Sequence, residues 1–163
     1  MVWKMKDVYD KEPVPDQGLR SVEIKIGKKS HWWKAGAFPR LKKIMDSKEP
    51  LIDAALKTGG VSLEETADAV SFLWESDKPI TPELIRSASL FFSLLCQYAA
   101  NAKRINMKEK SYENPKYQFR CLLLRIGAIG PDYKEMRRVL LDGIPGNSAW
   151  LHPQVKGKAE SRP

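Results

Sequence analysis

The sequence predicts an α+β protein with a small antiparallel sheet of about three strands, helices packed on that sheet, and a helical C-terminal half. Three observations support this prediction. Residues 21–26 alternate between apolar and polar side chains, residues 61–74 contain two short segments rich in β-branched and aromatic residues, and longer segments from residue 38 onward have helical apolar spacing. A length of 163 residues fits one domain with a core of its own.

The chain is expected to begin with an N-terminal arm at 1–20, because Pro13, Pro15 and Gly18 stand there among acidic residues. Residues 21–26 (SVEIKI) then predict a half-buried strand, and residues 27–36 predict a loop. A helical pattern follows, but Pro50 interrupts it. Either Ser47 caps a second helix with Pro50 in its first turn, or one helix kinks at that point. The pattern rests on these apolar positions: Phe38, Leu41, Met45, Ile52 and Leu56.

Two short strands are predicted next, at 61–64 and at 69–74 (AVSFLW), and their close spacing indicates a hairpin. The acidic residues Glu64, Glu65 and Asp68 stand at this connection. We expect them to form a solvated connection and not an acidic catalytic set.

The strongest helix is predicted from Thr81, a good N-cap residue, with Pro82 at the first helical position. Two shorter helices are predicted at 116–126 and 131–141, separated by a glycine-containing turn. The domain is therefore expected to span 21–150, followed by a flexible basic tail at 151–163. The apolar stripe predicted to be buried on the strongest helix consists of Leu84, Ala88, Phe91, Leu95 and Tyr98.

Charge is distributed in blocks along the chain, whose net charge is +8. Residues 25–43 hold seven basic residues and no acid, residues 46–83 hold nine acids against three bases, and residues 101–141 hold ten bases against four acids. Clustered positive charge of this kind is typical of proteins with a polyanionic partner, either nucleic acid or an acidic protein.

Several classes of protein are disfavoured by the sequence. It has no apolar run long enough for a membrane span and no signal-peptide pattern at the start, which predicts a cytoplasmic protein. Cys96 and Cys121 each lie in a predicted apolar helix, so we expect two buried free thiols. No group has metal-ligand spacing, and no nucleophile has a visible histidine partner; we therefore predict no metal, no cofactor and no catalytic residues.

Residues 38–150 resemble a family of small proteins encoded on conjugative elements and phages of Gram-positive bacteria, often labelled virulence-related. The resemblance rests on 41–56 (LKKIMDSKEPLIDAAL), on 114–124 (NPKYQFRCLLL), on 125–141 and on the GNSAW sequence at 146–150. Asp142 stands where the family pattern carries a basic residue. The resemblance implies an accessory role on a mobile genetic element, without an established activity.

A basic loop interleaved with aromatic residues is the first candidate binding site. Tryptophan can stack on an unpaired base while lysine neutralises phosphate, a combination suited to single-stranded nucleic acid. The same residues could form the centre of a protein interface. Alternatively, one tryptophan could cover the core with the other half exposed, while the lysines keep the loop soluble. The candidates are Lys28, Lys29, Trp32, Trp33 and Lys34, with His31 between them.

The second candidate lies on the two short C-terminal helices. These could form a helix-turn-helix that places its second helix in a DNA major groove, or a simple helical hairpin with a solvated basic face. The basic residues concerned are Arg120, Arg125, Lys134, Arg137 and Arg138.

Two functions remain consistent with these observations. The first is a nucleic-acid-binding accessory or regulatory protein of a mobile genetic element. The second is a protein that inhibits a host defence system, in the manner of an anti-CRISPR protein, by occupying a nucleic-acid or partner site.

Overall fold

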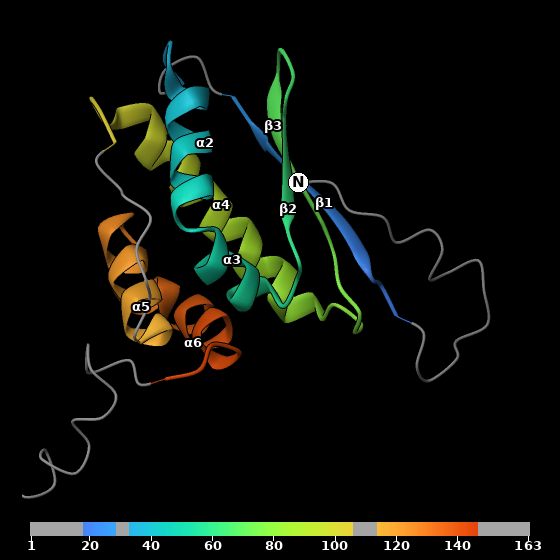
Figure 1. Cartoon of the computed structure of the whole chain (residues 1–163). Coiled ribbons are helices and arrows are strands. Elements are labelled where there is room, and N and C mark those ends of the chain that lie inside the picture. The colour runs from blue at the N-terminus through green and yellow to red at the C-terminus, as the bar shows by residue number, and fades with distance from the viewer. Residues whose placement is uncertain (1–17, 29–32, 106–113, 147–163) are drawn as a thin grey trace, which may run out of the picture.

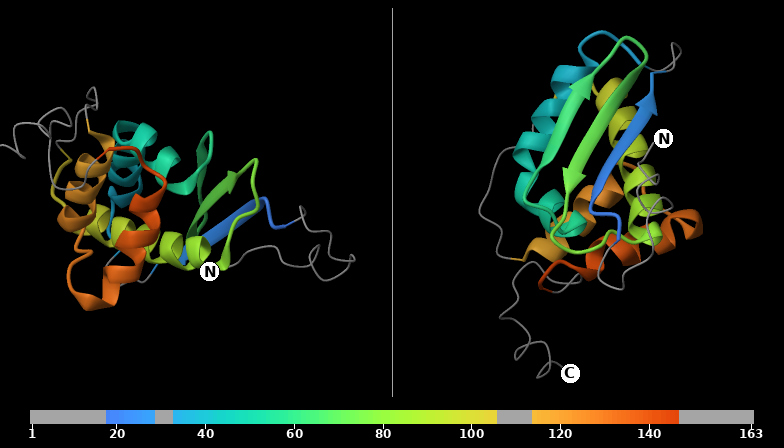
Figure 2. Two further views of the ribbon diagram at one scale, coloured as in Figure 1. Left: turned by 90° about the horizontal axis from the view of Figure 1, so that it is seen from below. Right: turned by 90° about the vertical axis from the view of Figure 1, so that its right-hand side faces the viewer.

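The computed structural model describes residues 18–28, 33–105 and 114–146, which form one α+β unit (Figure 1). A three-stranded sheet forms one layer, helices α2, α3 and α4 cover one of its faces, and α5 and α6 pack on these helices on the side away from the sheet (Figures 1 and 2). The predicted fold class is therefore confirmed. The elements are β1 (Ser21–Gly27), α2 (Ala37–Ser47), α3 (Glu49–Leu56), β2 (Val61–Glu65), β3 (Ala69–Glu75), α4 (Pro82–Asn101), α5 (Pro115–Arg125), the 3₁₀ turn η1 (Pro131–Tyr133) and α6 (Lys134–Asp142).

The sheet has the order β1-β3-β2 and is antiparallel throughout, as the hairpin prediction required. Because side chains alternate along a strand, one face of the sheet collects the apolar residues. On this face Phe72 stacks on Phe92 of α4 with ring centroids 4.0 Å apart, and Val22 and Ile24 of β1 are buried beside it. The other face carries mostly polar and charged residues, with half-buried Leu73 among them.

The central helix α4 begins as predicted. Thr81 accepts a hydrogen bond from the backbone N–H of Leu84 at 3.1 Å, and Pro82 occupies the first turn. Four of the five predicted stripe residues are buried, including Leu95, which is fully buried. The exception is Tyr98, which is only half-buried.

The interruption at Pro50 separates two helices. Lys48 stands between α2 and α3, and Pro50 lies in the first turn of α3, where its missing N–H costs nothing. Of the two alternatives, the second helix with Pro50 in its first turn is the one observed, but its N-cap residue is Lys48 and not Ser47. Its hydroxyl instead donates to the carbonyl of Lys43 at 2.7 Å, one turn back within α2.

The chain after α6 returns to the start of α5. The buried side chain of Asn114 caps α5 by accepting from the N–H of Tyr117, and the N–H of Lys116 donates to the carbonyl of Pro145. Gly146 has a φ of +112°, and a Cβ at this position would collide with the Asn114 side chain. Gly146 is thus packed against the start of α5. Residues 1–17 of the arm predicted at 1–20, and the tail predicted at 151–163, lie outside the described residues.

The two cysteines differ. Cys96 is fully buried in α4, and burial raises its thiol pKa from 9.0 to about 12. Cys121 is exposed, so the prediction of two buried thiols was wrong for this residue. It lies among apolar neighbours in sequence, but α5 presents Phe119, Leu122 and Leu123 to the core instead. No helix in the described ranges is long and apolar enough to cross a membrane.

Candidate nucleic-acid interface

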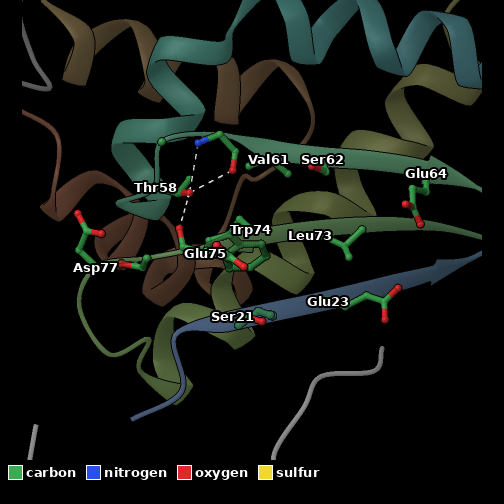
Figure 3. A pocket seen from close by; sticks show the side chains of 14 residues that line it. Ser21, Glu23, Thr58, Val61, Ser62, Glu64, Leu73, Trp74, Glu75 and Asp77 are labelled. Atoms are coloured by element: carbon green, nitrogen blue, oxygen red, sulfur yellow. Dashed lines mark hydrogen bonds between the residues drawn. The ribbon is translucent and has the colours of Figure 1, made fainter. Parts of the chain in front are cut away.

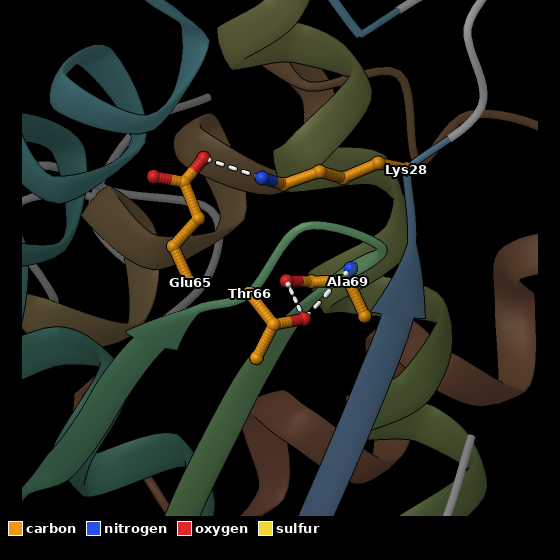
Figure 4. Close-up of polar contacts among 4 residues, drawn as sticks. All are labelled: Lys28, Glu65, Thr66 and Ala69. Atoms are coloured by element: carbon orange, nitrogen blue, oxygen red, sulfur yellow. Dashed lines mark hydrogen bonds and ion pairs between the residues drawn. The ribbon is translucent and has the colours of Figure 1, made fainter.

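Lys28, at the start of the predicted basic loop, is held close to the sheet. Its Nζ lies 2.7 Å from a carboxylate oxygen of Glu65 (Figure 4). The same Nζ lies 5.6 Å from the centre of the Trp33 ring. Its backbone N–H donates to the carbonyl of Asp68 at 2.8 Å. Lys28 therefore joins β1 to the acidic hairpin connection, and its charge is largely offset by Glu65.

Trp33 and Lys34 complete the described part of this loop. Trp33 is half-buried and packs against the core, whereas Lys34 is exposed. Lys29, Trp32 and His31 lie outside the described residues. The half-buried Trp33 fits the interpretation in which one tryptophan of this loop covers the core, although part of its surface stays accessible.

Arg40 provides a link that the sequence did not predict. Its guanidinium donates to the carbonyls of Ala99 at 2.6 Å and Ala100 at 3.2 Å, at the C-terminal end of α4. A cation at this position stabilises the negative end of a helix, and α4 has no basic residue in its own last turn. The contact holds the start of α2 against the end of α4, and Lys103 and Arg104 follow immediately after that end.

The result is a surface that we call the basic end, formed by Lys34, Arg40, Lys103 and Arg104. The described segments that build it, 33–45 and 97–105, contain no acidic residue. Lys34, Lys103 and Arg104 are exposed, and none of them forms an ion pair with another described residue. Exposed Lys42 and Lys43 continue the positive charge along α2.

The N-terminus of α2 adds to this positive potential. Its cap residue Gly36 has a φ of +82° and offers no side chain, and the first turn contains no acid. The positive end of the α2 dipole is therefore not neutralised by a capping carboxylate.

The basic residues of the C-terminal helices are used differently. Arg137 is partly buried, and its Nη1 donates to the carbonyls of Ala128 at 2.9 Å and Gly130 at 3.0 Å. It therefore holds the turn between α5 and η1. Arg138 pairs with Glu83 of α4 at 3.8 Å, between two exposed side chains. Such an exposed pair contributes little to stability, but it offsets the arginine's charge.

These contacts bear on the helix-turn-helix hypothesis. The exposed residues of α6 are two bases, Lys134 and Arg138, and two acids, Glu135 and Asp142. A helix with this balance lacks the surplus of positive charge that a major-groove helix needs. The arrangement favours the simpler helical hairpin, in which Arg120, Arg125 and Lys134 are solvated.

The predicted candidates fall into two groups at different ends of the molecule. The loop containing Lys28, Trp33 and Lys34 lies near the start of α2, and α6 lies at the opposite end in Figure 1. Within the described ranges, no group of histidine, cysteine and carboxylate side chains could hold a metal ion. The hairpin acids Glu64, Glu65 and Asp68 are exposed, consistent with a solvated connection.

Arg40, Lys103 and Arg104 were missed by reasoning from the sequence. Their signal was present in the acid-free block at 25–43 and in the basic block that starts after 101. The contact between the two blocks depends on tertiary structure, because it forms only when α2 packs beside α4. Comparison with known proteins found no matching family model, no similar curated protein and no similar solved structure.

Proposed function

We propose that the protein binds nucleic acid through the basic end. The observation that carries the proposal is the contact of Arg40 with the carbonyls of Ala99 and Ala100. This contact unites two basic segments into one surface without a described acid. The positive helix end beside them adds to the attraction for phosphate.

The character of this surface indicates binding to the sugar-phosphate backbone. Exposed lysine and arginine side chains of this kind neutralise phosphates but do not read base sequence. The accessible part of the Trp33 ring offers one stacking platform, which favours single strands over duplex. The proposed ligand is therefore single-stranded DNA or RNA, bound with little sequence specificity.

The number of contacts sets the expected salt dependence. If Lys34, Lys43, Lys103 and Arg104 each neutralise one phosphate, the slope of log K against log salt should be about −3 for single strands. It should be about −3.6 for duplex DNA, because duplex DNA condenses more counterions.

The test is fluorescence anisotropy with a labelled single-stranded oligonucleotide, titrated at several salt concentrations. The double variant K103A/R104A should weaken binding and reduce the magnitude of the slope by about 1.5. The matched control is R120A/R125A, which removes two exposed arginines from α5 and should leave both affinity and slope close to wild type. Equal losses in the two variants would contradict the choice of surface.

The absence of binding at low salt would refute the proposal as a whole. The better interpretation would then be the inhibitor of a host defence system, which requires a stable complex with a protein. A role on a mobile genetic element would follow only from the family resemblance, and the binding proposal does not depend on it.

A further inference from the structure

The turn between α5 and η1 presents an isoleucine to solvent. Ile129 is 64% exposed, more than any other large apolar side chain in the described ranges. Its neighbour Ala128 is fully buried, so the chain is anchored in the core immediately before the exposed side chain. Ile129 is therefore an apolar knob on a fixed base.

The turn around Ile129 is held by several independent contacts. Gly127 and Gly130 adopt φ values of +100° and +96°, which favour glycine. The N–H of Ala128 donates to the carbonyl of Leu123 at 2.9 Å, and Arg137 donates to the carbonyls of both Ala128 and Gly130. A turn held in this way loses little conformational entropy when it binds a partner.

The knob has basic residues on both sides. Arg125 ends α5 and Lys134 begins α6, and both are exposed without an ion pair to another described residue. The exposed acids nearby are Asp132 of the turn and Glu135 of α6, and Glu135 pairs with Arg86 at 3.7 Å. A complementary surface would therefore combine a hollow with an apolar floor and an acidic rim.

Such a surface exists on the same protein, on the face of the sheet that the helices leave uncovered (Figure 2). A hollow of about 760 Å³ lies there, with half-buried Leu73 of the central strand on its floor (Figure 3). None of the described residues that line it is a lysine or an arginine. Its rim carries Glu23, Glu64, Glu75 and Asp77.

We propose that the Ile129 turn of one molecule docks into the acidic hollow of a second copy of the same chain. Ile129 would contact Leu73, while Arg125 and Lys134 would face the carboxylates of the rim. The turn belongs to the α5–α6 layer and the hollow to the opposite face of the sheet, so one molecule cannot satisfy both surfaces itself (Figures 1 and 2). The contact is heterologous and leaves a free turn at one end and a free hollow at the other.

The association should be weak and sensitive to salt. One apolar knob and a few exposed charge pairs form an interface below the standard size, which corresponds to a dissociation constant on the order of 100 µM. Sedimentation equilibrium of the full chain should show a weight-average mass that rises with protein concentration. The mass should fall toward that of the monomer as salt is raised from about 50 to about 500 mM, because the rim charges are screened.

Two variants each disable one half of the contact. Ile129→Asp removes the apolar knob, and the double variant E64K/E75K reverses two charges on the rim. Each variant should be monomeric by itself, with the circular dichroism spectrum and melting temperature of the wild type. The control is Leu90→Asp, which changes the next most exposed apolar residue, at 43% exposure on α4, and should associate as the wild type does.

Mixing the two disabled variants gives the decisive measurement. Ile129→Asp keeps an intact hollow and E64K/E75K keeps an intact turn, so the mixture should form a one-to-one dimer and nothing larger. Four results would overturn the proposal: a wild type that stays monomeric at every concentration, association unaffected by Ile129→Asp, a mixture that stays monomeric, or equal loss of association with Leu90→Asp.

Discussion

Replacing Asp53 by asparagine should stabilise the protein at neutral pH and leave its stability at acidic pH nearly unchanged. Asp53 lies in the last turns of α3, beside a hollow of about 400 Å³ that is also lined by Lys57, Glu75 and Asp77. Two causes together raise the pKa of this carboxyl group from 3.8 to about 6: burial is the larger, and the negative charge of Glu49 is the smaller.

The sign of the effect follows from linkage. A group whose pKa is higher in the folded state favours folding only where it is protonated, so this contribution is lost as pH rises from about 4 through about 6. A shift of two pKa units corresponds to at most about 2.7 kcal/mol. Because Asp53 is only half-buried and solvent screens its charge, we expect about 1 kcal/mol.

The assay is urea unfolding of the wild type and Asp53→Asn from about pH 4 to about pH 8. The difference in unfolding free energy between the two proteins should grow by about 1 kcal/mol across this range and then level off. Glu49→Gln should recover a smaller part of the same gain, because the charge of Glu49 is the lesser cause. A difference that does not change with pH would refute the reasoning.

Three further predictions concern the core, the thiols and the α5–η1 turn. Leu95→Asp should prevent folding, because an unpaired carboxylate in the core costs several kcal/mol; an unchanged melting temperature would contradict the central place of α4. Exposed Cys121 should react with a thiol reagent in the native protein, whereas Cys96 should react only after denaturant is added; two fast thiols would disagree with the structure. Arg137→Ala should lower the unfolding free energy by about 1–3 kcal/mol, because it removes charged hydrogen bonds to two carbonyls, and a purely phosphate-binding arginine would leave stability unchanged.

The fold was predictable from the sequence because its signals are local. Alternation in β1, the hairpin of β2 and β3, and the Thr81–Pro82 start of α4 each depend on neighbouring residues. The errors arose where tertiary packing decides. Cys121 has apolar neighbours in sequence but faces solvent, because the core contact of α5 is made by another side of the helix.

The candidate sites were less predictable, because a basic residue can serve several purposes. Lys28 pairs with Glu65, and Arg137 holds a turn, whereas Lys34 is exposed. The sequence around these three basic residues does not reveal this difference. The contact of Arg40 with the end of α4 joins segments that lie far apart in the chain. Only the packing of α2 on α4 reveals that they form one surface.

The strand order also constrains how the sheet can assemble. The hairpin of β2 and β3 closes a short loop and can form early, whereas the pairing of Gly27 with Ala69 closes a loop that contains both α2 and α3. Closing a loop of roughly forty residues costs about 3 kcal/mol in chain entropy. The β2–β3 hairpin does not offset this cost by itself, so the contacts that β1 makes must do so. Of the three described strands, β1 should therefore join last although it precedes the other two in sequence, and its docking on β3 and α4 should limit the folding rate.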